Sequence, residues 1–585
     1  MEHRVKWMLL LILQALFLFG CASSEEDDSF LIGADETYET ENPDSYEVKD
    51  NKALYEEGED VVTMYLTVGR GNEEDGTDHS WTEVNSYPLD YYEENQTEPY
   101  KCEAVLQIGD DRGPIEGEFG YGERAANSTV QLRGQGASSQ QQKSYRIKIK
   151  DGKGRWEDQK TISLNKHLAD PVRFKNRLAY SLMEEIPQML GARTQFVHLY
   201  VKDKTEGEDG LFRDYGLYTQ VEQVNRTYLK NRNLDSDGSL YQAGEYFDWQ
   251  RHEDSILPAT DPDYDANQFE QYLEIDGSED HGKIIEMLEA VNNPDNSIEE
   301  VTARYFNEDN LYYWMAFHIL MGNKDVLQGN YYLYSPRGVD QWYFISWDND
   351  SVLKEGYEFL RDHTYERSWN YGIFTYADTV LFRRILQSES CRQLLDEAVE
   401  DLMSRYLTEE ILQEKIDAYK KIVKEYLYVL PDSTFARVTE EDYDILSDSM
   451  AEEVRTNYEN YKKSMNSVWP FHILDPVNRQ GKVILSWEDA YQFEEGDPAY
   501  SVELSKDYSF GDNIINTTVG DNSYEAEDLP PGQYFLRVRA EGTDGTVQDA
   551  YEYYRTESGS VCYSTLCFYI LEDGSAAAVE YSGDD

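Results

Sequence analysis

The most constraining feature of the sequence is an almost uninterrupted apolar stretch, LYYWMAFHILM, at residues 311–321. A helix that is apolar on nearly all sides leaves no face for water, so it must lie inside a core. Gly322 follows directly, and glycine is the residue type that most often ends a helix. The stretch therefore predicts a buried helix around which other parts of the chain pack.

Length and charge limit the classes of protein to consider. The 585 residues exceed what one hydrophobic core holds, so several domains are expected. Aromatic residues make up 14% of the chain, enough to build packed cores. The formal net charge of −62 repels nucleic-acid phosphates and favours a soluble monomer. We therefore expect no nucleic-acid partner.

The N-terminus has the pattern of a secretory signal that ends in a cysteine. Arg4 and Lys6 precede an apolar run at residues 7–19, shorter than the roughly 20 residues of a membrane span. Cys21 follows Gly20 as in a bacterial lipobox, which implies a signal peptide over 1–21 and lipid attachment at Cys21. An ordinary signal peptide with an incidental cysteine is the alternative. Residues 22–50 are acidic and predict a solvated linker, so we expect an extracytoplasmic lipoprotein anchored to the bacterial cell membrane.

The hydrophobic pattern changes twice along the rest of the chain. Short β-rich runs dominate from about 51 to 245, helical spacing dominates from about 246 to 466, and strand-period alternation returns over 470–585. In the last part, Trp487 and the run LPPGQYFLRVRA resemble a fibronectin type III-like sandwich. The order predicts an α+β protein with a β-rich lobe, an α-rich lobe and a small all-β sandwich.

Polar residues flank a predicted hairpin that follows the buried helix. NYYLYS (330–335) and WYFISW (342–347) have strand character, and PRGVDQ between them predicts the turn. Antiparallel pairing about that turn sets Ser335 opposite Trp342 and Asn330 opposite Trp347. Asn330 and Asp348 then share the open end of the hairpin, close to Asp325 in the preceding loop.

Oxygen-bearing side chains of this kind suit a hard cation such as Mg²⁺. The spacing of Asp325, Asn330 and a later Asp348 follows the logic of kinase sites, where the first Asp orients the attacking hydroxyl and the others hold metal on the phosphates. The simpler alternative is that Asp325 and Asn330 cap turns and Asp348 ends a strand.

An upstream segment, VQLRGQGASSQQQKSYRIKIKD (130–151), offers cations for phosphates. Its strand alternates Tyr145, Ile147 and Ile149 inward with Arg146 and Lys148 on the other face. These two could reach a nucleotide or simply line a wet face. Farther along, Glu222 ends a strand and could pair with such a lysine; by itself it would be read as a surface residue.

Four separated motifs in this order resemble the CotH family, the spore coat protein H-like atypical kinases. They are LRGQGASSQQQKSYRIKIK, GLYTQVEQVNRTYLK, NKDVLQGNYYLY and WYFISWDND, and the resemblance covers about residues 55–465. It implies an atypical protein-kinase-like fold over 51–466 that uses ATP and Mg²⁺ or Mn²⁺. The implied reaction transfers the γ-phosphate of ATP to Ser or Thr of a protein.

The resemblance also implies roles for individual residues. Asp325 would be the catalytic Asp, and Asn330 and Asp348 would bind the metal. Nucleotide contacts would come from Arg133, Ser138, Glu222 and one of Lys143, Arg146 and Lys148, with Lys148 preferred. The loop reads RGQGASS where the family has RGNSS, so one Asn is replaced and one Gly is added.

Two other classes of function fit parts of the pattern. A surface adhesion or binding protein could use the same scaffold without catalysis, with the C-terminal module as a spacer. Alternatively, Asp348-Asn349-Asp350 could be the DxD motif with which glycosyltransferases hold a metal on a sugar nucleotide. The sequence does not identify a protein substrate.

Overall fold

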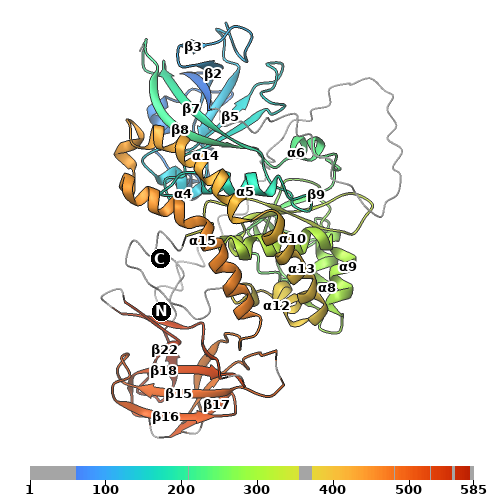
Figure 1. The fold of residues 1–585 in the computed structure, drawn as a ribbon, viewed down its shortest axis with the longest axis vertical. Helices are drawn as coiled ribbons and strands as arrows, with labels where there is room; N and C mark the ends of the chain where they lie inside the picture. The colour runs from blue at the N-terminus through green and yellow to red at the C-terminus, as the bar shows by residue number, and fades with distance from the viewer. Residues whose placement is uncertain are drawn as a thin grey trace. The chain divides into compact units, whose positions relative to one another are not determined.

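A computed structural model describes residues 61–579, apart from 208–209, 245, 355–371, 480, 494, 528, 544 and 557–559. The predicted signal peptide, the acidic linker and the lipid site at Cys21 lie outside the described residues. Within the described part, no helix combines the length and the apolar character needed to cross a membrane. The described chain mixes sheets and helices, as predicted for the α+β class (Figure 1).

The first sheet closes on itself. Its strand order is β1-β7-β8-β6-β5-β4-β2-β3, and β1 pairs with both β7 and β2, which makes a barrel. The strands are β1 (Val62–Gly69), β2 (Lys101–Asp110), β3 (Gly113–Pro114), β4 (Ser128–Leu132), β5 (Tyr145–Ile149), β6 (Thr161–Asn165), β7 (Thr194–Asp203) and β8 (Arg213–Val221).

Side chains alternate between the barrel interior and its surface, as the pleat of a strand requires. On β5, Tyr145, Ile147 and Ile149 are buried in the barrel core, whereas Arg146 and Lys148 between them are exposed. This confirms the predicted alternation. Both cations therefore lie on the outer surface of the barrel.

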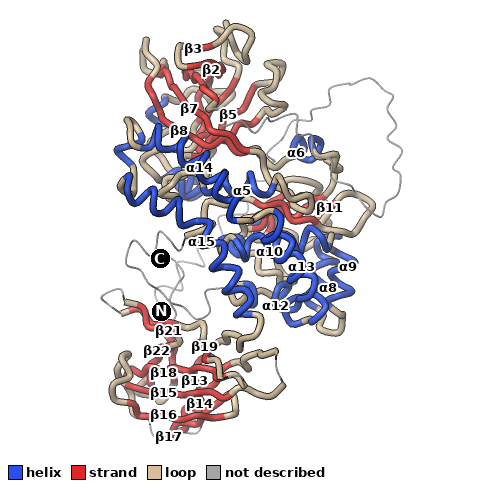
Figure 2. Tube along the Cα trace, in the orientation of Figure 1, coloured by secondary structure: helices blue, strands red, loops and turns tan. Residues whose placement is uncertain are grey.

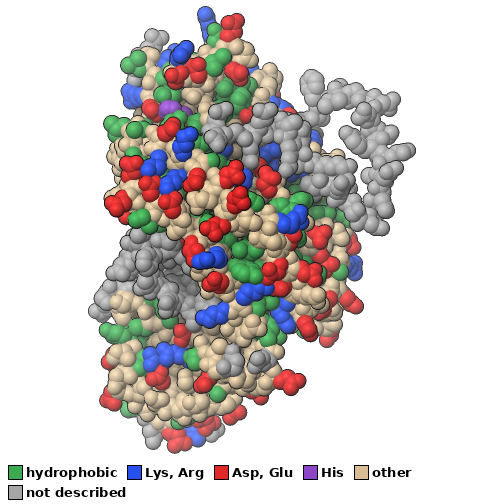
Figure 3. Space-filling view, viewed as in Figure 1, with side chains coloured by type: hydrophobic (Ala, Val, Ile, Leu, Met, Phe, Trp, Pro, Cys, Tyr) green, Lys and Arg blue, Asp and Glu red, His purple; other side chains and the backbone are tan. Residues whose placement is uncertain are grey.

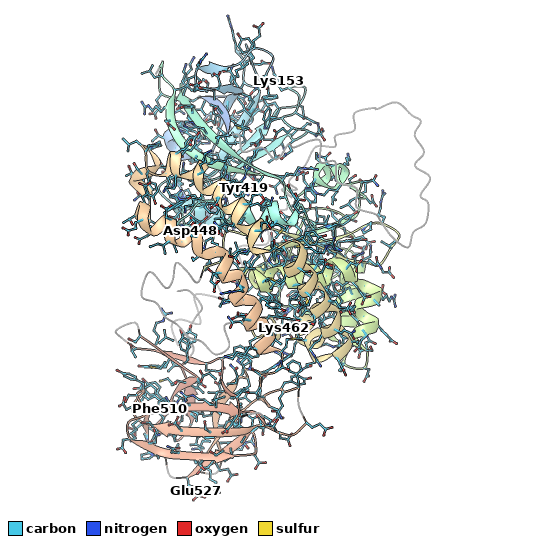
Figure 4. All side chains as sticks on the ribbon, viewed as in Figure 1. Lys153, Tyr419, Asp448, Lys462, Phe510 and Glu527 are labelled. Carbon is cyan, nitrogen blue, oxygen red and sulfur yellow. The ribbon has the colours of Figure 1, made fainter. Side chains whose placement is uncertain are left out.

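Short helices connect the barrel strands, and one long helix packs against the outside of the barrel. The connecting helices are α2 (Trp81–Val84), α3 (Leu89–Asn95), α4 (Gln135–Ser139) and α5 (Lys175–Met183). The long helix α14 (Glu409–Leu427) contacts β8 and α5. Its Tyr419 lies edge-on to Phe196 of β7, and the Arg177 guanidinium of α5 lies over the same tyrosine ring (Figure 4).

A small sheet lies among the remaining helices, in the order β10-β9-β11-β12. Its strands are β9 (Ser239–Ala243), β10 (Leu273–Ile275), β11 (Tyr331–Ser335) and β12 (Tyr343–Ser346). β11 and β12 form the predicted hairpin, with Tyr331 opposite Ser346 and Tyr334 opposite Tyr343. This register is the one that the turn at 336–341 predicts.

The helices around this sheet are mostly amphipathic, and all of them except α8 and α12 begin at a side chain that caps the first turn. They are α6 (Arg226–Asn231), α7 (Ala266–Glu270), α8 (Gly282–Asn292), α9 (Ile298–Tyr305), α10 (Glu308–Leu320), α12 (Val380–Gln387), α13 (Glu389–Arg405) and α15 (Glu440–Ser464) (Figure 2). Ser297, Asn307 and Thr439, for example, accept hydrogen bonds from the first turns of α9, α10 and α15.

Helix α10 is the predicted buried helix. Ten of its residues are buried, and it contacts α13, α15 and β12. Gly322 follows with φ +61°, a left-handed conformation that favours glycine. A Cβ there would lie 2.9 Å from the Asn457 amide nitrogen of α15, so the close approach of α15 also favours glycine.

The C-terminal strands form two antiparallel sheets around one core. One has the order β13-β14-β17 and the other β16-β15-β18-β22-β23, with β19 added to β18 and a separate pair β20-β21. Trp487 is buried, and the Tyr534 hydroxyl donates to the Pro530 carbonyl at 2.7 Å, as a tyrosine corner does. The arrangement is compatible with the predicted fibronectin type III-like module. The strands are β13 (Ile473–Arg479), β14 (Lys482–Trp487), β15 (Ala499–Ser505), β16 (Asn513–Val519), β17 (Ser523–Glu527), β18 (Gly532–Glu541), β19 (Val547–Asp549), β20 (Tyr553–Arg555), β21 (Val561–Tyr563), β22 (Thr565–Ile570) and β23 (Ala576–Ala578).

Candidate functional site

The three predicted acid and amide residues meet at the open end of the β11–β12 hairpin. Asp325 begins the 3₁₀ turn η2 (Asp325–Gln328), Asn330 directly precedes β11, and Asp348 follows β12 by two residues. The Trp347 amide donates to the Asn330 carbonyl at 3.2 Å, which extends the hairpin pairing to its open end. Gly329 adopts φ +97° and lies close to the end of β9. A Cβ at this position would lie 2.6 Å from the Ala243 carbonyl oxygen, so glycine allows the two segments to approach one another.

The carboxylate of Asp325 is held on one side. The Asn330 amide nitrogen donates to Asp325 Oδ2 at 2.7 Å, and the Ser351 hydroxyl lies 3.1 Å from the same oxygen. Asn330 therefore directs its amide nitrogen to the Asp325 carboxylate. Its amide oxygen is the atom that could serve a cation. Sequence reasoning missed Ser351, although it follows the WDND motif directly.

Asp348 and Asp350 form a second acidic point beside Asp325. Asp348 adopts a left-handed φ of +44°, which Asp tolerates better than most residues and which often marks a functional site. Burial raises the pKa of the Asp348 carboxyl, and the charges of Asp350 and Asp325 raise it further. Asp350 is different, because His167 Nδ1 lies 3.5 Å from its Oδ2 and helps to lower its pKa against the effect of burial.

These groups fit a divalent cation that also binds phosphate. Two neighbouring carboxylates repel one another when both are ionised, and a cation between them would remove that repulsion. Among the described residues, no cluster of three or more His, Cys, Asp or Glu side chains could hold a metal by itself. Mg²⁺ commonly binds one or two carboxylates together with substrate phosphates, which is the set available here. Asp348, Asp350 and the Asn330 amide oxygen are the groups that would hold it.

Two arginines provide positive charge near these carboxylates. The Arg133 guanidinium lies 5.9 Å from the centre of the Trp347 ring, and Asp348 is close enough to raise its pKa. Burial, together with the neighbouring charge of Arg146, lowers the pKa of Arg133 to about 10. Arg133 Nε is buried and has no hydrogen-bond partner within the described part of the chain. Two adjacent cations, one with a spare buried donor, suit an anion such as phosphate.

Comparison with known protein families settles the relationship. Residues 130–466 match the family model described as CotH kinase protein. The chain belongs to the CotH family. This confirms the resemblance seen in the motifs and makes the chain a kinase-like protein.

Comparison with individual proteins adds remote likenesses. A search of curated proteins found no match. Among solved structures, the Helicobacter pylori proinflammatory kinase CtkA is 10% identical, with 55% of this chain and 94% of that chain covered and a TM-score of 0.28. HipA, in a Shewanella oneidensis MR-1 complex with HipB and operator DNA, is 11% identical, with 62% and 64% covered and a TM-score of 0.22.

The segment of this CotH protein that was expected to form a nucleotide loop is a short helix, α4. Ser138 is buried in it, and its hydroxyl accepts from the Leu89 amide at 2.9 Å and donates to the Gln135 carbonyl at 2.6 Å. Lys143 donates to the Ser138 carbonyl at 2.7 Å. Ser138 and Lys143 thus stabilise the loop itself, which differs from the predicted contact of Ser138 with nucleotide.

The preference for Lys148 as the phosphate contact stays a prediction. Lys148 lies two residues after Arg146 on β5, and after Lys160 it is a further cation that lowers the pKa of Asp151, beyond the end of that strand. Arg146 is the residue that affects Arg133, next to Asp348. Strand alternation places both cations on one face, and Arg146 is the one whose charge acts on Arg133.

Glu222 does not form the predicted ion pair with a lysine. Its carboxylate lies 2.7 Å from Arg232 Nη2 and 3.3 Å from Arg193 Nη1, and all three side chains are buried. A buried lysine–carboxylate pair exists elsewhere: Lys166 Nζ lies 2.7 Å from Asp432 Oδ1, on the side of the barrel that α14 covers. Glu222 therefore acts in joining β7, β8 and α6.

A buried polar network supports the two loops of the CotH site, and sequence reasoning missed it. Asn323 stands two residues before Asp325. Its side-chain amide nitrogen lies 3.2 Å from His318 Nδ1 and 3.4 Å from Asn349 Oδ1. The Asn349 amide in turn donates to Asn176 of α5 at 3.1 Å. The signal in the sequence is faint: a histidine inside an otherwise apolar helix, which usually marks a core residue with hydrogen-bond partners.

Proposed function

We propose that this CotH protein is an extracytoplasmic atypical protein kinase, anchored to the bacterial cell membrane by lipid at Cys21. It would transfer the γ-phosphate of ATP to Ser or Thr hydroxyls of surface or secreted proteins. The observation that carries the proposal is the position of Asp325. Its carboxylate is hydrogen-bonded to Asn330 and stands next to the Asp348–Asp350 pair.

Each group of the site has a part that its surroundings support. Asp325 would accept the proton of the acceptor hydroxyl, and Arg133 with Arg146 would bind phosphate oxygens. Mg²⁺ or Mn²⁺, when bound by Asn330 and Asp348 together with Asp350, would neutralise charge on the phosphates. Phosphoryl transfer asks mainly for positioning and for neutralisation of charge, and these residues can supply both.

The surface of the molecule is consistent with a protein acceptor. Acidic side chains are spread over the face shown in Figure 3, in line with the formal net charge of −62. Such a surface repels nucleic acids and attracts cationic groups.

Nucleotide binding tests the proposal against its two alternatives. We would measure thermal shifts of the protein from residue 24 onward with ATP and with a sugar nucleotide, each with Mg²⁺ or Mn²⁺. The proposal predicts a metal-dependent shift with ATP, which Asp348→Ala abolishes. Asp276→Ala serves as the control, because this acidic residue follows β10 and has no proposed role. A shift only with the sugar nucleotide would indicate a glycosyltransferase, and no shift with either would indicate a binding protein.

A further inference from the structure

Ser351 lies inside the site and contacts the proposed base. Its side chain is buried, and its hydroxyl oxygen lies 3.1 Å from Asp325 Oδ2 and 3.5 Å from Asp350 Oδ1. A hydroxyl has a single hydrogen to donate, and the shorter contact is the better hydrogen bond. An ionised carboxylate only accepts, so Ser351 donates to Asp325.

This contact changes what the Asp325 carboxylate can do. Oδ2 receives two hydrogen bonds, one from Asn330 and one from Ser351, whereas neither of these residues donates to Oδ1. The last torsion of an aspartate side chain is broad, so a single donor leaves the carboxylate free to rotate. Two donors on one oxygen, from two different loops, fix the plane of the carboxylate.

We propose that Ser351 is a positioning residue for phosphoryl transfer: together with Asn330 it holds Oδ2, so that Oδ1 is the atom that takes the proton. The inference rests on the proposed kinase function. In that reaction the acceptor hydroxyl oxygen forms a bond to the γ-phosphorus. The bond from that phosphorus to the bridging oxygen breaks, ADP leaves, and the hydroxyl proton passes to Asp325 Oδ1.

The place of Ser351 in the chain gives this contact a second consequence. Ser351 follows Asp348 and Asp350 on one short segment, whereas Asn330 follows Asp325 on another. One segment therefore supplies Asp348 and Asp350 for the cation and Ser351 as a donor to the base. The other supplies the Asn330 amide, whose oxygen would serve the cation and whose nitrogen donates to the base. The hydrogen bond of Ser351 connects the position of the cation-binding segment to the orientation of the base.

The first test separates positioning from folding and from nucleotide binding. We would compare wild type with Ser351→Ala, Ser351→Thr and the control Ser335→Ala, another buried serine, at the far end of the same hairpin. We expect Ser351→Ala to lower kcat by about 10- to 100-fold, because a misplacement of a catalytic group by about 1 Å can cost about 100-fold. The KM for ATP and the Kd for a non-hydrolysable ATP analogue with Mg²⁺ should stay within about twofold. Ser351→Thr keeps the hydroxyl and should restore most of the rate.

Three results would overturn the proposal. They are a kcat of Ser351→Ala within twofold of wild type, an equal loss in Ser335→Ala, or a matching loss of affinity for the ATP analogue. A rate of Ser351→Thr as low as that of Ser351→Ala would also count against it.

A crystallographic comparison keeps the inference apart from the proposed function. Crystal structures of wild type and Ser351→Ala, both with the ATP analogue and Mg²⁺, should show the Asp325 carboxylate turned to a different angle in the variant. If wild type transfers no phosphate, the kinase function fails, and this comparison still decides the role of Ser351. An unchanged carboxylate in the variant would refute it.

Discussion

His318 should make the region of the candidate site sensitive to acid. The side chain is fully buried at the end of α10. The Asn323 amide nitrogen lies 3.2 Å from His318 Nδ1 and can only donate, so Nδ1 must accept. Nε2 then carries the hydrogen and donates to the Ser346 hydroxyl at 3.1 Å. A protonated ring would point a second N–H at the Asn323 amide, and burial lowers the pKa of His318 to about 3.

The size and direction of the effect follow from this pKa. In the unfolded chain the ordinary histidine value of 6.5 applies, so between pH 6.5 and about 3 the unfolded state holds one proton more than the folded state. The free energy of unfolding therefore falls as the pH falls, by about 1.4 kcal/mol for each pH unit below 6.5. At pH 4.5 the free energy of unfolding is lower by about 3 kcal/mol because of this residue. Above pH 6.5 His318 is neutral in both states and causes no loss of stability.

Urea unfolding of wild type and His318→Gln between pH 7.5 and 4.5, followed by tryptophan fluorescence, measures this loss. Between pH 7.5 and 4.5, the free energy of unfolding of wild type should fall by about 3 kcal/mol more than that of the variant. The control His252→Gln, at a partly exposed loop histidine, should follow wild type. If His318→Gln loses stability in parallel with wild type, His318 does not stay neutral in the folded protein and the reasoning is refuted.

Three further predictions concern other parts of the fold. Burial raises the pKa of Glu157 from 4.5 to about 7, so the folded state keeps a proton that the unfolded state loses, and stability falls as the pH rises from 4.5 to 7. Between pH 4.5 and 7, the free energy of unfolding of wild type should therefore fall by about 2 to 3 kcal/mol more than that of Glu157→Gln, as measured by urea unfolding. Equal pH dependence of the two proteins would contradict this. Asp432→Ala leaves the buried Lys166 without its carboxylate and should cost about 3–5 kcal/mol in the free energy of unfolding; a cost below about 1 kcal/mol would show that the pair adds little. Tyr534→Phe removes the hydrogen bond to Pro530 and should lower the stability of the C-terminal strands by about 1 kcal/mol, measured by hydrogen exchange of their amides; unchanged exchange would argue against the corner.

Periodicity and turn chemistry predicted much of the fold. The apolar stretch at 311–321 became the buried helix α10, and the turn at 336–341 set the register of β11 and β12. Both results depend on local rules, because a helix without a polar face must be buried and a hairpin register follows from its turn. The same register brought Asn330 and Asp348 to one end.

The parts that sequence reasoning missed depend on contacts between distant segments. Closure of the first sheet requires β1 to pair with β7, far away in the sequence, and no local pattern reports such a partner. Glu222 was expected to meet a lysine and meets two arginines, one of them directly after helix α6. Strand alternation treats Arg146 and Lys148 alike. Ser351 had no motif to mark it, and only its distance from Asp325 reveals a role.

The central claim is that Asp325 is the base of a phosphoryl transfer whose nucleotide is held by other residues. The most direct measurement incubates the protein from residue 24 onward with γ-labelled ATP and Mg²⁺ or Mn²⁺, beside the Asp325→Ala variant. Label on the protein itself and on a generic protein acceptor is counted, and ATP binding is measured by calorimetry. We predict that wild type transfers label and that the variant binds ATP about as well but transfers none. Equal labelling by wild type and variant, or loss of ATP binding together with labelling, would contradict the account.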